Sequence, residues 1–290
     1  MRPGASLLGL VVAFAALSAV FALLETRLRS ADSPIFFRRR DFATDLAYWF
    51  FTLLASRSFT RIAVGLSVAG AVWLSGGSIE ALRSEIAAGR VPELGWAAGR
   101  EQLRALPFAL QLLLGLALAD ALAYWMHRAF HARPLWGLHA VQHSSPRLDW
   151  LSSVRLHPLN QALMSVVQAL PLLFLGFDPR VFAVVAPLFT LYAILIHANV
   201  GWSFGPLKRV IATPRFHRWH HSSADAGRDK SFAGLFPIWD LLFGSYYMPE
   251  NQIPTEFGAG AEPVPAGLWR QLAYPFRRPK PGEALASERV

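Results

Sequence analysis

The chain has 290 residues, of which 53% are hydrophobic and 16% are charged. This composition is too apolar for an ordinary water-soluble domain, and the length suits a single integral membrane domain. The absence of cysteine excludes disulfides, thiolate metal ligands and cysteine nucleophiles. The net charge of +9 fits the basic bias of membrane proteins, and because the basic residues form no long stripe we expect no nucleic-acid partner.

The first apolar segment, residues 5–24, is long enough to cross a bilayer, which needs roughly 20 apolar residues. No clean small-residue cleavage site follows it. Basic residues follow instead, from Arg27 to the run at 38–40. We therefore predict an uncleaved transmembrane helix whose C-terminal end faces the cytoplasm.

The next apolar region, residues 42–75, is interrupted by the sequence RSFTR at 57–61. It is either one long broken crossing or two shorter helices. Residues 78–104 have mixed charge and predict a loop with an interfacial helix. Residues 1–104 thus form an N-terminal region of membrane helices and interfacial loop.

Residues 105–126 form a clear membrane helix, and two further apolar runs lie at 159–176 and 180–196. The sequence Gly-Phe-Asp-Pro between these two runs is typical of a turn. They therefore predict a helical hairpin, which returns the chain to the membrane face that it left. We assign residues 105–250 to one domain and residues 251–290 to an irregular tail.

The nine histidines lie mainly at the ends of the apolar segments. They are His127, His131, His139, His143, His157, His197, His217, His220 and His221. Both His127/His131 and His139/His143 have the i, i+4 spacing that places two rings on one helix face, where they can share a metal ion.

The segment from His217 to His221 has the pattern HxxHH. Adjacent imidazoles point about 100° apart on a helix, so this segment can serve two metal ions. The number of imidazoles exceeds what one tetrahedral zinc takes and indicates a dinuclear centre. Asp120 precedes His127 by two turns, and we expect it either to accept a hydrogen bond from a ligand ring or to make a structural hydrogen bond within the bundle.

The motifs YWMHRAFH, LHAVQHSS and RFHRWHH resemble the histidine boxes of the fatty acid hydroxylase and sterol desaturase superfamily. DWLSSVRLHP, HANVGW and FPIWDLLFGSYY also resemble sequences of that superfamily. The resemblance covers about residues 120–250 and implies an all-α membrane protein with a dinuclear site at the cytoplasmic end of its helices.

Carried over by position, the resemblance makes all nine histidines metal ligands, with no catalytic residue beyond the metal centre. His157 and His197 match additional histidines of the family, and for them a structural role is the alternative. One departure concerns the second box, which reads HxxQH because Gln142 replaces a histidine of the family pattern. An amide oxygen binds iron less well than imidazole, so one site is expected to be weaker or the activity altered.

The resemblance implies two iron ions, with zinc possible in purified protein, that use dioxygen and two external electrons to hydroxylate or desaturate a C–H bond of a lipid. Sterols, sphingolipids and fatty acyl chains are all open as substrates. A separate electron donor is implied, either a cytochrome b5-like protein, a ferredoxin or a flavoprotein. The composition favours a bacterial inner membrane, with the metal site facing the cytoplasm.

Three other functions are open. A metal transporter would need polar residues repeated through its apolar helices, and 105–119 and 180–196 contain few. A zinc-dependent lipid hydrolase would bind zinc tightly and need no oxygen or reductant. A zinc protease is disfavoured, because Arg128 stands where the helix of such a protease carries its glutamate base. A family member with an impaired metal site would follow from Gln142 and would have a non-catalytic role.

Two sets of residues near the boxes have both a functional and an ordinary interpretation. Aromatic side chains either line a lipid channel or pack and anchor in the membrane interface: Tyr124, Trp125, Trp136, Trp150, Trp202 and Trp219. Arginines either dock an acidic electron carrier or bind lipid phosphates: Arg133, Arg147, Arg209, Arg215 and Arg218.

Overall fold

The structure of the protein is a computed structural model that describes residues 7–30, 41–74, 76–88, 100–260 and 264–277. Regular structure within these ranges is helical, apart from isolated bridges that join Arg29 to Val200 and Ser222 to Phe257. This confirms the predicted all-α class. The basic run at 38–40, and the tail from 278, lie outside the described residues.

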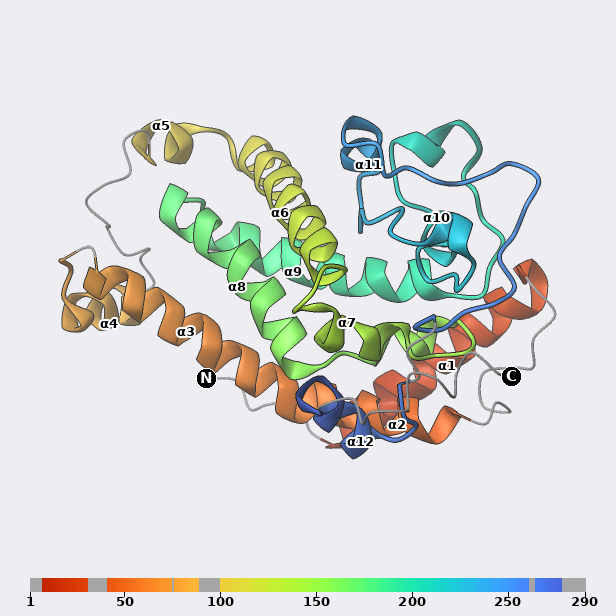
Figure 1. Ribbon diagram of the computed structural model, residues 1–290. Coiled ribbons are helices and arrows are strands. Elements are labelled where there is room, and N and C mark those ends of the chain that lie inside the picture. Colours follow the sequence, from red (N-terminus) through yellow and green to blue (C-terminus); the bar gives the residue numbers. More distant parts are fainter. Residues whose placement is uncertain (1–6, 31–40, 75, 89–99, 261–263, 278–290) are drawn as a thin grey trace.

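Long helices form the body of the molecule, and short helices lie at both of its ends (Figure 1). The long helices are α1 (Leu7–Leu28), α3 (Arg57–Leu74), α6 (Phe108–Phe130), α8 (Pro158–Leu175) and α9 (Pro179–His197). The short helices are α2 (Phe42–Phe51), α4 (Ile79–Ala87), α5 (Arg100–Ala105), α7 (Trp136–His143), α10 (Pro214–His220), α11 (Ile238–Leu242) and α12 (Leu268–Ala273).

Four helices among the described residues are long and apolar enough to cross a membrane. They are Leu7–Leu28, Phe108–Phe130, Pro158–Leu175 and Arg180–His197. Large apolar side chains such as Leu113 and Leu191 are exposed on them, as expected for surfaces that face lipid tails. The predicted multi-pass membrane class is therefore confirmed.

The region 42–74 is one broken helix rather than two separate ones. A single π-helical turn, Thr52–Ser56, joins α2 directly to α3. The sequence RSFTR begins α3 instead of interrupting it, and α3 then runs beside α8 (Figure 1). The π turn marks the place where the helix geometry changes.

The predicted hairpin of α8 and α9 is also present. Gly176 ends α8 in the left-handed region (φ 84°), which favours glycine, and the Asp178 side chain caps α9 by accepting from the Arg180 N–H at 2.8 Å. The Gln111 side-chain oxygen accepts from the Asp178 N–H at 3.1 Å and ties this turn to the start of α6. The end of α9 that carries His197 therefore lies beside the end of α6 that carries His127.

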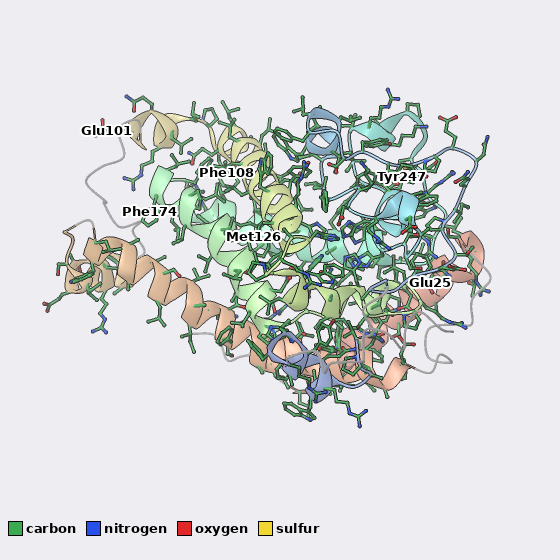
Figure 2. The ribbon with its side chains drawn as sticks, in the orientation of Figure 1. Glu25, Glu101, Phe108, Met126, Phe174 and Tyr247 are labelled. Atoms are coloured by element: carbon green, nitrogen blue, oxygen red, sulfur yellow. The ribbon has the colours of Figure 1, made fainter. Side chains whose placement is uncertain are left out.

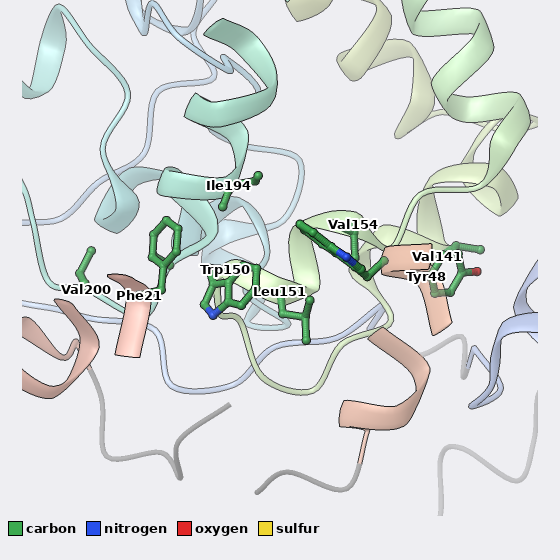
Figure 3. Close-up of a cluster of buried hydrophobic side chains, with 10 residues drawn as sticks. Phe21, Tyr48, Val141, Trp150, Leu151, Val154, Ile194 and Val200 are labelled. Carbon is green, nitrogen blue, oxygen red and sulfur yellow. The ribbon is translucent and has the colours of Figure 1, made fainter. Parts of the chain in front are cut away.

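A cluster of buried side chains joins α1, α2, α7 and α9 around Trp150 (Figure 3). Trp150 stacks on Phe21 with ring centroids 5.5 Å apart and meets the edge of Trp49 at 6.1 Å. Such aromatic pairs contribute about 0.5–1.5 kcal/mol beyond their buried area. This core fixes the segment that leads from α7 to α8.

The tail predicted as irregular contains a docked helix. The Gln271 side chain on α12 donates to the Ser144 hydroxyl at 3.0 Å, and the Leu272 carbonyl accepts from His157 at 3.1 Å. Gln271 is almost fully buried. Residues after 250 thus contribute a cover for the end of α7, which periodicity in so short a segment does not reveal.

Candidate metal centre

The end of α6 supplies the first two imidazoles. The His127 Nδ1–H donates to the Phe232 carbonyl at 2.6 Å, and the His131 Nδ1–H donates to the Asp229 carboxylate at 3.0 Å. With Nδ1 protonated in this way, each Nε2 carries a free lone pair. Both Nε2 atoms therefore face inward as potential metal ligands.

Helix α7 supplies His139 and His143, one turn apart and 2–3% exposed. The His139 Nδ1 lies 3.1 Å from the Asn160 side-chain oxygen at the start of α8. This contact again leaves Nε2 free for a ligand role.

Helix α10 supplies the last three imidazoles. Thr213 caps this helix by accepting from the Phe216 N–H at 3.0 Å, and Pro214 occupies its first turn. The His220 Nδ1–H donates to the Lys230 carbonyl at 2.9 Å. In Figure 2, side-chain nitrogen atoms are dense where α6, α7 and α10 meet.

Five imidazoles converge in one group, which we call the five-nitrogen group: His127, His131, His139, His143 and His220. Their potential ligand atoms all lie within 4.8 Å of one another. The Nε2–Nε2 distances are 3.0 Å for His127–His139, 3.2 Å for His139–His143 and 3.1 Å for His143–His220.

These distances fit one bound cation. Two nitrogens about 2.1 Å from one ion lie about 3.0 Å apart at a right angle and about 4.2 Å apart on opposite sides. Lone pairs facing one another at this separation repel unless a cation or proton lies between them. The His131 Nε2 is buried without a hydrogen-bond partner, as a metal ligand would be.

The remaining converging imidazoles form the three-nitrogen group: His197, His217 and His221. The His217 Nε2 lies 3.2 Å from that of His197 and 3.1 Å from that of His221. The Gln142 amide, on α7, lies 3.4 Å from the His197 Nε2. The His143 and His221 rings stack at 4.3 Å between centroids, so the two groups are immediate neighbours.

The surroundings keep the ligand candidates neutral. Burial, and then the neighbouring imidazoles, hold the pKa values of the histidines on α7 and α10 well below the usual range. Only the neutral imidazole has a lone pair to give to a metal. At neutral pH these side chains are therefore ready to bind a cation without first losing a proton.

Two buried carboxylates shape the loop that supports His127 and His220. Asp240 accepts from the Phe232 N–H at 2.9 Å and the Ala233 N–H at 2.8 Å. Asp120 accepts from the Leu235 N–H, the Phe236 N–H and the Trp239 indole at 2.9–3.1 Å. Of its two predicted roles, Asp120 therefore has the structural one, and it acts on the centre only through this loop.

His157 lies outside both groups. Its Nδ1 accepts from the Leu159 N–H at 3.2 Å as the cap of α8, and its Nε2–H donates to the Leu272 carbonyl. Both ring nitrogens are thus used within the protein. The histidine before Pro158, at the start of an apolar helix, was the sequence signal for a cap.

Most of the aromatic side chains near the boxes pack in the interior. Tyr124, Trp150 and Trp219 are buried, and Trp136 packs on the rings of His131 and His143. Trp125 differs because it is 48% exposed and contacts Phe243 at 4.6 Å between centroids. The structure therefore gives Tyr124, Trp150 and Trp219 the packing role.

Two of the five arginines are engaged inside the protein. Arg218 is buried, where it donates to the Leu148 carbonyl at 3.0 Å and lies over the Phe257 ring. Arg215 donates to the backbone carbonyls of Pro249, Glu250 and Gln252. Arg133, Arg147 and Arg209 are exposed at the surface.

Sequence reasoning missed Asn160 and Asp240 and drew no role for Asp229. Asp240 stands in the quoted motif FPIWDLLFGSYY, where a lone acid among apolar residues was the available signal. Asn160 follows His157 by three residues and carried no such signal. The carbonyls of Lys230 and Phe232 could not be found this way, since every residue has one.

Part of this chain is similar in sequence to known proteins. Residues 112–245 match the fatty acid hydroxylase family. The chain is 35% identical over 173 residues to ornithine lipid hydroxylase OlsE of Rhizobium tropici, and the match covers 59% of this chain and 52% of that protein.

Two other relatives match over a smaller share of this chain and of their own length. Alkylglycerol monooxygenase of Homo sapiens is 36% identical over 131 residues, which are 45% of this chain and 29% of that protein. Very-long-chain aldehyde decarbonylase GL1-1 of Oryza sativa subsp. indica is 30% identical over 170 residues, 54% of this chain and 27% of that protein. The chain thus spans about half the length of these relatives or less, and no solved structure matches it. Both imidazole groups lie inside residues 112–245, the part of the chain that matches the fatty acid hydroxylase family.

Proposed function

We propose that this chain is a membrane-bound di-iron oxygenase that hydroxylates or desaturates a C–H bond of a lipid. One observation carries the proposal: eight imidazoles, six of them buried and two half-buried, converge in two adjacent groups at the end of apolar, membrane-length helices. Nitrogen-rich sites suit iron, copper or zinc, and the relatives named above include a lipid hydroxylase and a monooxygenase.

The reaction balances with one dioxygen and two external electrons. Iron held by the two groups would supply the dioxygen chemistry that removes hydrogen from an unactivated C–H bond. In hydroxylation, one C–H bond, dioxygen, two electrons and two protons give one alcohol and one water. In desaturation, the same inputs remove two hydrogens from neighbouring carbons and give a double bond and two waters.

The protein's own residues hold and shield the centre. The Nδ1 atoms of His127, His131 and His220 are engaged with fixed acceptors, so their rings keep one tautomer and one orientation. Six of the eight imidazoles are buried, which limits the access of bulk water that would otherwise quench a strong oxidant. In this proposal no histidine acts as a general base.

The substrate we propose is a membrane lipid that reaches the centre from the bilayer. The exposed apolar faces of α6 and α9 lie in contact with lipid in a membrane, and the centre sits at one end of these helices. The electrons come from a separate carrier, a cytochrome b5-like protein, a ferredoxin or a flavoprotein, because the chain has no cysteine for an iron–sulfur cluster. We place the centre on the cytoplasmic face of a bacterial inner membrane, where such carriers are present.

The test combines metal content with lipid profiling. Cells with and without the protein are grown in air and without oxygen, and their lipids are compared by mass spectrometry. We expect iron in the purified protein and a lipid that gains 16 mass units, or loses two, only with protein and oxygen present. Turnover of a lipid without oxygen by a tightly zinc-bound protein would refute the proposal in favour of a hydrolase.

Two histidine variants provide a matched pair for this test. His220→Gln removes one imidazole from the five-nitrogen group, whereas His157→Gln removes one that lies outside both groups. We expect the first to abolish the oxidised lipid and the second to retain it. Iron-loaded wild type that changes no lipid in air would favour the impaired, non-catalytic family member instead.

A further inference from the structure

The two imidazole groups are unequal, and the difference lies at one residue of α7. Gln142 lies between His139 and His143 along the helix, but its side chain points to the other group. Its amide nitrogen, as placed, is 3.4 Å from the His197 Nε2. Helix α7 thus contributes two imidazoles to the five-nitrogen group and one amide to the three-nitrogen group.

The hydrogen bonds of His197 define what this amide faces. The His197 Nδ1–H donates to the Ala193 carbonyl at 2.6 Å, so its Nε2 carries a lone pair. Without a cation, the Gln142 NH2 can donate to that lone pair. With a cation shared by His197, His217 and His221, the same position suits an acceptor that faces the ion.

An amide can meet both conditions by one rotation. Turning the terminal carboxamide by 180° exchanges its oxygen and nitrogen with almost no change in shape. The oxygen then occupies the place of the nitrogen, beside the His197 Nε2 and on the side of the three-nitrogen group. No backbone movement is required.

We propose that Gln142 is the fourth protein ligand of the three-nitrogen group and binds its metal ion through the amide oxygen. This rests on the proposed function only in taking both groups to be metal sites. The pair is therefore asymmetric: one ion has five imidazoles, and the other has three imidazoles and an amide. Because an amide oxygen is a poorer ligand than imidazole for iron or zinc, the second ion is bound less tightly and leaves first.

Metal titration of variants at this position tests the proposal. Detergent-solubilised protein is dialysed against graded free ferrous iron under argon, and metal per chain is measured. We expect two midpoints for wild type. Gln142→His should raise the affinity of the weaker site at least about tenfold, and Gln142→Leu should lower that affinity by a similar factor. Tenfold is the lower end of the loss in metal affinity seen when a residue that only hydrogen-bonds a metal ligand is mutated. The stronger midpoint should not move.

Gln168→Leu is the matched control, because it removes a half-buried glutamine amide that bonds only the Ala119 carbonyl. It should leave both midpoints in place. Thermal unfolding of each metal-free variant shows whether the fold is intact, and Gln142→Glu supplies a second substitution with an oxygen ligand, which should also strengthen the weaker midpoint.

The proposal is overturned if Gln142→His and Gln142→Leu leave the weaker midpoint unchanged, or if they move the stronger one. A parallel titration with zinc measures the ligand set whichever metal is native. Zinc binding in two midpoints without iron binding would refute the proposed oxygenase and leave the role of Gln142 standing. A single ion per chain with either metal would refute the role of Gln142.

Discussion

Replacing Asp240 with asparagine should loosen the metal centre without touching any ligand. The Asp240 carboxylate accepts from the Phe232 and Ala233 N–H groups and, at 2.6 Å, from the Ser245 hydroxyl. Asparagine is nearly the same size but offers one acceptor oxygen and one NH2 group. One buried backbone N–H then faces a donor, and the remaining hydrogen bonds lose the charge on their acceptor.

The expected loss is large for so small a change. An unsatisfied buried donor costs about 1–3 kcal/mol, and hydrogen bonds to a neutral acceptor are weaker than those to a charged one by about 1 kcal/mol. We expect Asp240→Asn to lower the free energy of unfolding by about 2–4 kcal/mol. The Phe232 carbonyl, which accepts from His127, also loses its fixed position, and the affinity of the five-nitrogen group should fall about 10–100-fold.

Thermal unfolding and metal titration of the purified variant measure the two effects. Asp225→Asn is the matched control, because Asp225 is exposed and pairs only with Arg228 on the surface. An Asp240→Asn protein that unfolds and binds metal like the wild type would show that the loop does not hold His127 in place.

Two further predictions concern pH and packing. Burial holds the pKa values of the histidines of α7 and α10 below their ordinary value, so the unfolded chain binds more protons than the folded one at acidic pH. Metal-free protein should therefore lose stability as pH falls through about 6.5, with a slope that rises toward at most about 1.4 kcal/mol per histidine per pH unit. A melting temperature that is flat between about pH 7.5 and 5.5 would contradict this. A Cβ at Gly115 of α6 would lie 2.7 Å from the Val181 Cγ1 of α9, so Gly115→Ala should destabilise the protein by about 1–3 kcal/mol. Gly65 of α3 faces open space, so Gly65→Ala should stabilise the protein slightly in the same thermal assay.

The local parts of the centre could be predicted from sequence because helix geometry converts spacing into direction. The i, i+4 pairs on α6 and α7 do share a group, and the adjacent residues His220 and His221 do serve different groups. The hairpin turn at Gly176 to Pro179 correctly placed both halves of the centre at one end of the helices.

The division of ligands between the two groups could not be predicted. It depends on how α6, α7, α9 and α10 cross in space, and spacing within one helix does not contain that information. His157 illustrates the limit: its position before a helix is compatible with a ligand and with a cap, and only the placement of Leu272, more than a hundred residues away, shows that both nitrogens are used. The supporting carbonyls of the loop carry no residue-type signal at all.

The position of α10 in the chain also sets the order in which the centre can be assembled during synthesis. The five-nitrogen group needs His220, and the three-nitrogen group needs His217 and His221. The four helices of membrane length in the described part of the chain precede these residues. Neither group is therefore complete on a nascent chain until the ribosome has passed His221, by which point these four candidate spans have been made.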